Sequence, residues 1–376
     1  MNKDEIFNIP HNKPRVLVAP LDWGLGHATR CIPIIFKLVQ QNCEVIVAAE
    51  GDVKILLQKE FPNLIFFDLR GYRMQYCRNK FWLPAKLLLQ FPKLIYRIHR
   101  ERRWLKKIVR EYKIDAVITD NRMGLSHAKI PCVYITHQLK IKTGNRFTES
   151  IAQKMHYHFI NKFVACWVPD AEAEKNLAGE LSHPAILPKV HVNYLGPLSR
   201  FEKTTVENKY DLCIVLSGPE PQRTIFERLI LKDIKDFKGN VFLLRGLPGE
   251  TLIPEINNHA FEIKNHLPAA LLNTLLQQSK MIICRSGYSS VMDLVKLQKK
   301  AILVPTPGQT EQEYLAGYLQ NQKLFFCVEQ KYFSLPAVLK AASGFQYTEI
   351  MFSQNEYELV IEDFIGGLKK INNAGI

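Results

Sequence analysis

The chain of 376 residues, 47% hydrophobic and 10% aromatic, is long enough for two globular domains with cores of ordinary size. Its 50 lysines and arginines exceed its 36 aspartates and glutamates, and the formal net charge of +14 attracts polyanions such as nucleic acid, anionic lipid or phosphorylated substrates. The 8 cysteines include no C-x-x-C pair, which disfavours metal or redox clusters and indicates reduced thiols in a cytosolic protein.

The first half of the chain alternates short apolar strands with helices. The polar stretch 1–13 lacks the apolar core of a signal peptide, and the chain has no run of about eighteen apolar residues that would predict a transmembrane helix. Strands are predicted at 15–21, 44–50, 64–69, 115–120, 131–137 and 166–170, and helices at 29–40, up to about 59, and at 148–163. This alternation is typical of a doubly wound parallel sheet.

The pattern breaks between 195 and 209, which we interpret as a linker. A second series then follows, with strands predicted at 211–218, 240–246, 280–287 and 301–307, and helices at 227–235, 269–278, up to about 297, and at 356–370. The sequence therefore predicts an α/β fold with two doubly wound, Rossmann-like domains facing a central cleft. The domains are expected at 1–198 and 209–352, and a C-terminal helix in 353–376 is expected to pack back on the first domain.

The densest positive charge lies between Lys80 and Lys113, where cations alternate with leucines and aromatic residues and the acidic residues are Glu101 and Glu111. This composition is typical of a helix at an anionic membrane surface, and it predicts a cytoplasmic protein held peripherally on the inner face of the cytoplasmic membrane. A second interpretation is a solvated basic helix whose apolar face packs into its own domain. Nucleic acid is disfavoured as a partner, because no recognition motif accompanies the charge.

A glycine-containing motif over 20–30 follows the first predicted strand. Gly24 and Gly26 permit a sharp turn and a close approach of the backbone to a ligand, and the helix after them directs its amide groups into the same space. At the tip of this loop, His27 can remove a proton from an attacking hydroxyl near neutral pH. The alternative is a histidine that only caps the helix. The chain lacks G-x-x-x-x-G-K-[ST], which disfavours ATP hydrolysis of the P-loop kind.

A second motif, over 284–293, again places a turn of small residues between a buried strand and a helix. Ser286 and Gly287 would expose backbone amides to a diphosphate, with Arg285 or the helix dipole neutralising its charge. Asp293 falls about two turns into the helix, where its carboxylate can accept both hydroxyls of a ribose.

A loop containing proline and glycine, at 305–314, brings Gln309, Glu311, Gln312 and Glu313 together. Clustered amides and carboxylates suit the hydroxyls of a sugar, because each offers paired acceptors or donors. A polar surface loop is the alternative interpretation. The other two motifs favour sugar binding.

In these motifs the chain resembles the two-domain glycosyltransferases of the GT-B fold. It is most similar to the family of the peptidoglycan-precursor enzyme that adds N-acetylglucosamine to a lipid-linked muramyl substrate, glycosyltransferase family 28. The order and spacing of 284–293, 304–307 and 312–314 carry the resemblance, and Gly24 to His27 match the N-terminal glycine loop in outline. Weaker similarities lie at 136–138 and 196–200.

The resemblance implies that the domain at 209–352 holds a UDP-sugar donor. The implied contacts are Gly218, Arg223, Arg285, Ser286 and Gly287 at the diphosphate, Asp293 at the ribose, Leu267 at the uracil, and Gln312 and Glu313 at the sugar. Two departures from the family pattern leave the donor sugar open. Glu313 stands where the family usually has a second glutamine, and the turn 217–223 replaces the family's G-G-S-Q-G turn.

For the first domain, the resemblance implies an acceptor side. It makes His27 the catalytic base or the residue that orients the acceptor, with Asp120 as a second candidate for the base. The acceptor or phosphate loop would contain Gly24, Gly26, Thr29 and His137. The absence of a D-x-D motif agrees with an enzyme that uses no metal and no cofactor beyond its UDP-sugar co-substrate, because the fold stabilises the leaving diphosphate with helix dipoles and cations.

The leading functional prediction is transfer of a hexose or N-acetylhexosamine from UDP to a lipid-linked or polymeric glycan, with inversion implied by the family. A second is a UDP-sugar hydrolase of the nonulosonic-acid pathway type, whose loop is similar to 24–31 and in which His27 would activate water. The long basic segment disfavours this alternative. A third is a non-catalytic nucleotide-sugar-binding protein, against which His27 and Asp293 argue.

Overall fold

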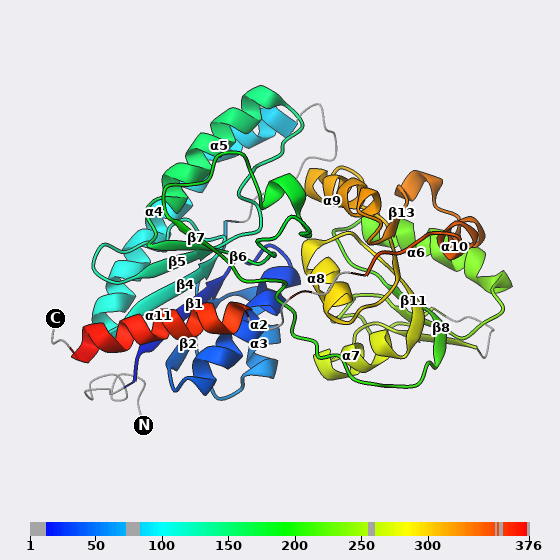
Figure 1. The fold of residues 1–376 in the computed structure, drawn as a ribbon, viewed down its shortest axis with the longest axis horizontal. Helices are drawn as coiled ribbons and strands as arrows, with labels where there is room; N and C mark the ends of the chain where they lie inside the picture. Colours follow the sequence, from blue (N-terminus) through cyan, green and yellow to red (C-terminus); the bar gives the residue numbers. More distant parts are fainter. Residues whose placement is uncertain (1–12, 73–82, 255–259, 350–351, 353–355, 374–376) are drawn as a thin grey trace. The chain divides into compact units, whose positions relative to one another are not determined.

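In a computed structural model the chain divides into two compact units, unit 1 (1–198 and 352–376) and unit 2 (199–351) (Figure 1). The structure describes residues 13–72, 83–254, 260–349, 352 and 356–373. Each unit consists of a parallel sheet covered by helices, so the predicted α/β class with doubly wound domains is confirmed.

The sheet of unit 1 has the strand order β3-β2-β1-β4-β5-β6-β7, and its neighbouring strands are parallel. Its strands are β1 (Arg15–Pro20), β2 (Glu44–Ala49), β3 (Ile65–Asp68), β4 (Ala116–Asp120), β5 (Cys132–Ile135), β6 (Ala165–Val168) and β7 (His191–Tyr194). The central strands are continuous apolar runs because helices cover both of their faces. The chain builds outward from β1 to β3 and then returns to β4, so the strand order reverses between β1 and β4. Pro20 of β1 pairs with Asp120 of β4 at this switch point, where open α/β sheets bind ligands.

Five longer helices cover the described part of this sheet: α2 (Leu25–Gln40), α3 (Gly51–Glu60), α4 (Leu83–Tyr112), α5 (Arg146–Ile160) and α11 (Glu356–Asn373). On one face, Leu105 and Ile108 of α4 and Ile160 of α5 share a buried cluster with Leu17 and Val117 of the strands. Helices α2 and α3 lie on the opposite face (Figure 1), as right-handed crossovers require when the strand order reverses.

Helix α11, from the end of the chain, packs against α2 and β7 of unit 1. The ring centroids of Trp167 and Phe364 are 5.5 Å apart in an edge-to-face contact. The Lys37 ammonium of α2 lies 2.6 Å from the Glu358 carboxylate and 2.7 Å from that of Glu362. Hydrogen bonds to these two carboxylates raise the pKa of Lys37. One helix from the last part of the sequence therefore belongs to the unit built from the first part.

Unit 2 repeats the topology, with the strand order β10-β9-β8-β11-β12-β13 and parallel pairing. Its strands are β8 (Tyr210–Val215), β9 (Val241–Leu244), β10 (Phe261–Lys264), β11 (Ser279–Cys284), β12 (Ala301–Leu303) and β13 (Phe326–Cys327). Its longer helices are α6 (Gln222–Asp233), α7 (Ala269–Gln277), α8 (Tyr288–Lys296), α9 (Thr310–Asn321) and α10 (Leu335–Ser343). The order reverses between β8 and β11, where Val215 pairs with Cys284. The loops after these strands therefore border the switch point of unit 2.

The predicted strands of the first half are confirmed to within about two residues at each end. The pattern does not predict β7, β10 or β13, because these edge strands are short and half-exposed and lack an apolar run. Lys80, where the predicted basic segment begins, lies outside the described residues, and from Leu83 the segment forms the single helix α4. Across the described ranges, no helix combines the length and the apolar composition needed to cross a membrane.

Candidate active site

The glycine motif of unit 1 forms the junction between β1 and α2. Gly24 is the N-cap of α2 and has φ of 93°, a left-handed conformation that glycine adopts without strain. The helix begins at Leu25, four residues before the predicted start, so His27 lies in its first turn and not at the tip of a loop. The predicted position of His27 at the tip of a loop is therefore wrong. Gly24 provides the non-helical residue before α2, so the helix begins earlier than predicted and has no side-chain cap. Within the first turn, Thr29 Oγ1 donates a hydrogen bond to the Gly26 carbonyl at 3.0 Å.

Three side chains meet at the switch point of unit 1: His27 and Arg30 from α2, and Asp120 from the end of β4. The Arg30 guanidinium binds Asp120 in a fork, with Nε close to Oδ2 and Nη2 at 2.7 Å from Oδ1. His27 Nδ1 lies 3.1 Å from Asp120 Oδ1 and 2.6 Å from Arg30 Nη2. With the ring proton on Nδ1, His27 donates to Asp120, which holds the imidazole by its Nδ1 edge, while the Arg30 guanidinium, itself only a donor, lies beside that edge. His27 Nε2 makes no hydrogen bond to any residue that the structure describes.

Burial and charge set the protonation states of this cluster. Asp120 is fully buried, which alone would raise its pKa, but the charge of Arg30 and hydrogen bonds from His27 and Arg30 bring that pKa well below the ordinary range. Burial lowers the pKa of His27, opposed by Asp120 and assisted by Arg30. At neutral pH the cluster thus contains an ionised carboxylate and a neutral imidazole. A neutral histidine with an unoccupied ring nitrogen is suited to accept a proton.

Two more residues complete the surroundings of the cluster. Arg30 Nη1 lies 3.1 Å from Nδ1 of the buried His137, so His137 lies against the guanidinium group. Asn121 donates a hydrogen bond from its side-chain amide to Asp120 Oδ1 at 3.1 Å. The sequence prediction includes His137 but not Arg30 as a site residue. The signal for Arg30 is its spacing, because residues three apart on a helix share one face and Arg30 follows His27 by three.

In unit 2, the loops after β8, β11 and β12 come together. Gly218, with φ of 98°, is placed so that a Cβ atom would lie 3.4 Å from Thr306 Oγ1, a buried hydroxyl without a hydrogen-bond partner among the described residues. Gly287 is the N-cap of α8, and a Cβ atom on it would lie 4.0 Å from Gln312 Nε2. Ser286 Oγ donates to the Gln312 carbonyl at 2.9 Å. The structure therefore brings Gly218, Ser286, Gly287 and Gln312 to one edge of the sheet.

The amide and carboxylate side chains predicted to meet a sugar also shape their own loop. Gln312 Oε1 accepts a hydrogen bond from the Thr306 backbone amide at 2.9 Å, and Glu313 Oε1 accepts one from the Gly308 amide at 3.0 Å. Gln312 Nε2 donates to Gln309 Oε1 at 2.5 Å. The bonds join the loop after β12 to the first turn of α9, to which Glu311, Gln312 and Glu313 belong, so these three residues lie in a helix and not in the predicted loop.

Asp293 lies in α8 and accepts a hydrogen bond at 2.6 Å from Ser199 Oγ. Burial raises the pKa of Asp293 to about 6, an effect that Ser199 and the charge of Arg200 partly oppose. The carboxylate therefore titrates close to neutrality, and its other oxygen is not held by Ser199.

Two predicted donor contacts are arranged differently. Arg285 is 1% exposed, and its guanidinium donates to the carbonyls of Val304 and Gln222 and lies 4.4 Å from the centre of the Phe226 ring. Arg223 is 5% exposed and is paired with two glutamates, Glu220 and Glu227. Both guanidinium groups hold α6 against the sheet and its loops. We therefore assign them a structural role and leave them out of the proposed phosphate site.

The predicted uracil contact, Leu267, lies between β10 and α7, at the edge of the sheet. It is two strands removed from β8 in the strand order. Its contact with a base stays a prediction.

Two doubly wound, Rossmann-like units in one chain define the class of proteins with the GT-B fold. The chain belongs to glycosyl transferase family 1, whose sequence profile matches residues 16–339. Among curated relatives, the UDP-N-acetylglucosamine–N-acetylmuramyl-(pentapeptide) pyrophosphoryl-undecaprenol N-acetylglucosamine transferase of Glaesserella parasuis is 23% identical over 333 residues, which cover 84% of this chain and 85% of the relative. An uncharacterised glycosyltransferase of Methanosarcina acetivorans is 21% identical, covering 80% of this chain and 81% of that protein.

Solved structures agree on the fold. The MurG protein of Acinetobacter baumannii superposes with a TM-score of 0.57 at 15% identity, covering 94% of this chain and 99% of MurG. The glycosyltransferase SnogD of Streptomyces nogalater gives a TM-score of 0.58 at 11% identity, covering 95% of this chain and 100% of SnogD. The GT-B fold and the resemblance to the peptidoglycan-precursor enzymes, both expected from the sequence, are confirmed.

Proposed function

We propose that this glycosyltransferase moves a hexose or N-acetylhexosamine from a UDP-sugar to a lipid-linked or polymeric glycan at a membrane surface, with inversion at the anomeric carbon. The observation that carries the proposal is the buried cluster in which Asp120, itself held by Arg30, fixes the neutral His27 by one edge of its ring. The names of the curated relatives, which specify UDP-N-acetylglucosamine and an undecaprenol-linked acceptor, support this choice of donor and acceptor.

His27 is the proposed general base. Its Nε2 takes the proton of the acceptor hydroxyl as the hydroxyl oxygen bonds to the anomeric carbon and the bond from that carbon to the UDP oxygen breaks. Asp120 is a poorer candidate for this base, because it is fully buried and its low pKa makes it a weak proton acceptor. We assign it the role of a positioning residue, itself held by Arg30, that fixes the imidazole and stabilises the imidazolium, whereas the charge of Arg30 opposes that cation.

The donor is proposed to bind unit 2 with its diphosphate at the N-terminus of α8, against the backbone amides beyond Ser286 and Gly287. Gly218 and the hydroxyl of Thr306 border the same edge of the sheet, and the Thr306 hydroxyl has hydrogen-bonding capacity to spare. Asp293 would bind the ribose, and Gln312 and Glu313 the sugar. The proposal includes no metal, because the helix terminus supplies the positive potential for the leaving diphosphate.

Titration calorimetry with UDP, UDP-N-acetylglucosamine, UDP-glucose and GDP tests the donor. We expect uridine nucleotides to bind the wild-type protein, UDP-N-acetylglucosamine to bind best of the sugars, and Asp293→Ala to lose this binding. Asp236→Ala is the matched control, because Asp236 is an exposed aspartate of the same unit. A folded wild-type protein that binds no uridine nucleotide would overturn the donor assignment. In an assay with donor and acceptor, release of free sugar with no transfer to a glycan would show that the protein is a UDP-sugar hydrolase and not a transferase.

A further inference from the structure

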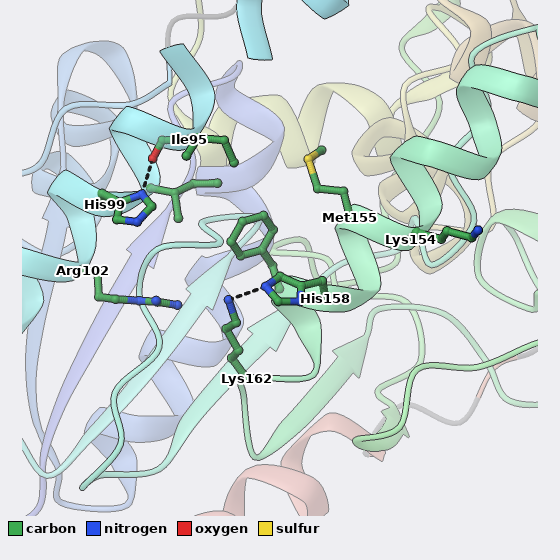
Figure 2. Close-up of a pocket in the computed structure, with 9 residues that line it drawn as sticks. Ile95, His99, Arg102, Lys154, Met155, His158 and Lys162 are labelled. Carbon is green, nitrogen blue, oxygen red and sulfur yellow. Dashed lines mark hydrogen bonds between the residues drawn. The ribbon is translucent and has the colours of Figure 1, made fainter. Parts of the chain in front are cut away.

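A cavity of about 540 Å³ opens between α4 and α5 of unit 1 (Figure 2). None of its lining residues belongs to the cluster around His27 or to the proposed donor site. It is lined by Ile95, Ile98, His99 and Arg102 of α4 and by Lys154, Met155, His158, Phe159 and Lys162 of α5 and the residues after it. Its volume lies within the range of ordinary small-ligand sites.

The lining follows from the helical period. On α4 the lining residues are Ile95 and the residues three, four and seven positions after it, which lie on one stripe of the helix. On α5 the lining residues are Lys154 and the residues one, four and five positions after it, which also lie on one side of the helix. The two stripes face each other across the cavity (Figure 2).

One part of the cavity is cationic. Arg102 and Lys162 extend toward each other across the gap, and the Lys162 ammonium lies 2.8 Å from Nε2 of His158 (Figure 2). The lining contains no carboxylate. Burial lowers the pKa of Lys162, and the charge of Arg102 lowers it further, so the two cations repel each other across the cavity. An anion between them would remove this repulsion.

The other part is apolar. Ile98 and Phe159 line it and are 1% and 7% exposed, and Ile95 and Met155 pack against the same small core. The two parts meet at the Phe159 ring, whose centre lies 4.7 Å from the Lys162 ammonium. A ligand that fills both parts therefore has a compact anionic group joined to hydrocarbon. This composition describes an amphiphile better than a nucleotide, which would require polar contacts for its base and sugar.

The helix surface beside the cavity is unusually apolar for one that faces solvent. Phe147 and Ile151 are 74% and 53% exposed on α5, and they lie on the same stripe as Lys154 and His158. Tyr96 of α4 is 60% exposed. Aromatic and aliphatic side chains beside clustered cations are typical of a surface that lies in the interface of an anionic membrane.

We infer that this cavity binds the phosphate group of a membrane phospholipid, with Arg102, His158 and Lys162 around the phosphate and the first carbons of the lipid on Ile98 and Phe159. The proposed function includes contact with a membrane surface, and this inference rests on that contact but not on sugar transfer. It makes the contact a defined lipid site that includes α5, and not only a diffuse attraction by the basic helix.

The first experiment measures binding of the full chain to vesicles of phosphatidylcholine with and without phosphatidylglycerol. We expect Arg102→Gln/Lys162→Gln to weaken binding to the anionic vesicles about tenfold. The matched control is Arg103→Gln/Lys106→Gln, which removes the same charge from exposed positions of α4 outside the cavity. It should weaken binding about threefold or less. Equal losses in the two double variants would show diffuse attraction and overturn the inference.

The second experiment needs no variant, and so decides the matter even if the first double variant fails to fold. Soluble dihexanoylphosphatidic acid should displace the wild-type protein from anionic vesicles at a concentration at least about tenfold below that of inorganic phosphate. Equal potency of the two competitors would identify a site for free phosphate and overturn the lipid assignment. Calorimetry with UDP on the same samples separates the two proposals, because failure to bind UDP refutes the proposed donor without affecting the result with vesicles.

Discussion

Both sheets run in the same order through their first strand: third, second, first, fourth. The groups at their two switch points nevertheless differ in chemistry. In unit 1 the ends of β1 and β4 hold a buried cluster of charged and titratable groups: His27, Arg30 and Asp120. In unit 2 the ends of β8 and β11 offer glycines and backbone amides, and the nearby Arg285 points into the core. Topology therefore places a site without deciding its chemistry. A charged cluster suits proton transfer, whereas backbone amides at the N-terminus of a helix suit an anionic ligand.

The sharpest test of this comparison is His27→Ala. If unit 1 supplies the base, the rate of transfer should fall by about 10³-fold, within the range that general bases contribute. UDP affinity should stay unchanged within about twofold, since the donor is assigned to unit 2. The assay measures UDP release with donor and acceptor, and calorimetry measures UDP binding. The exposed His191 provides a control, because His191→Ala should leave both quantities unchanged. Loss of UDP affinity in the His27 variant would contradict the division of roles.

Asp120→Asn should destabilise unit 1, because it leaves the buried Arg30 without its carboxylate partner. Breaking a buried ion pair in this way costs about 3–5 kcal/mol of unfolding free energy. In contrast, Asp68→Asn removes an exposed partner of Lys54 and should cost less than about 1 kcal/mol. Urea unfolding of the two variants measures the difference. Similar losses of unfolding free energy in the two variants would mean that the buried pair of Arg30 and Asp120 contributes no more to stability than an exposed ion pair.

The pH dependence of donor binding tests Asp293. Its folded-state pKa of about 6 means that the carboxylate proposed to bind the ribose becomes protonated as the pH falls through 6. The ligand for this test is UDP-N-acetylglucosamine, because the terminal phosphate of UDP itself titrates at about pH 6. Its affinity should therefore drop by about tenfold for each pH unit below the pKa of Asp293. In Asp293→Asn the affinity should be weak and independent of pH. The values pH 5 and pH 8 lie about one unit or more on either side of this pKa. A wild-type affinity that does not change between them would exclude a contact with the ionised form of Asp293.

The free energy of unfolding should change with pH in the direction opposite to the ligand affinity. Because burial raises the pKa of Asp293, the charged form destabilises the folded state above pH 6, and this cost disappears as the pH falls below the unfolded-state value of about 4. Asp293→Asn should therefore be more stable than the wild type at pH 8, by on the order of 2 kcal/mol, and no more stable near pH 4. Thermal unfolding at the two pH values measures this difference. A variant that is less stable at pH 8 would show that the hydrogen bond from Ser199 outweighs the burial of charge.

The smallest predicted effect concerns Gly218. Its φ of 98° strains any other residue, so Gly218→Ala should shift the loop after β8 and weaken UDP binding several-fold, about 1 kcal/mol. Gly249→Ala is the control, because a Cβ atom there meets nothing within 4 Å. Equal UDP affinity in the two variants would remove Gly218 from the donor site.

The sequence predicts the buried strands well because their continuous apolar runs end in small-residue turns, as β1 and β11 do. It also predicts that His27, Ser286 and Gly287 follow strand ends, since in such folds the sites lie there. It does not reveal which way a long polar side chain turns. Arg285 directly follows β11 and Arg30 lies in the helix after β1, but the first is held by core carbonyls and the second by a carboxylate. These partners come from segments distant in the chain, so local patterns carry no information about them.

The attachment of α11 to unit 1 has a consequence for biosynthesis. Unit 2 spans a continuous stretch, 199–351, whereas unit 1 requires 352–376 as well as its first 198 residues. A nascent chain that has reached residue 351 therefore carries all of unit 2 but leaves the surface of α2 around Lys37 uncovered. The part of the protein that is translated first is completed last, because α2 gains its contact with α11 only after residues 356–373 have been made.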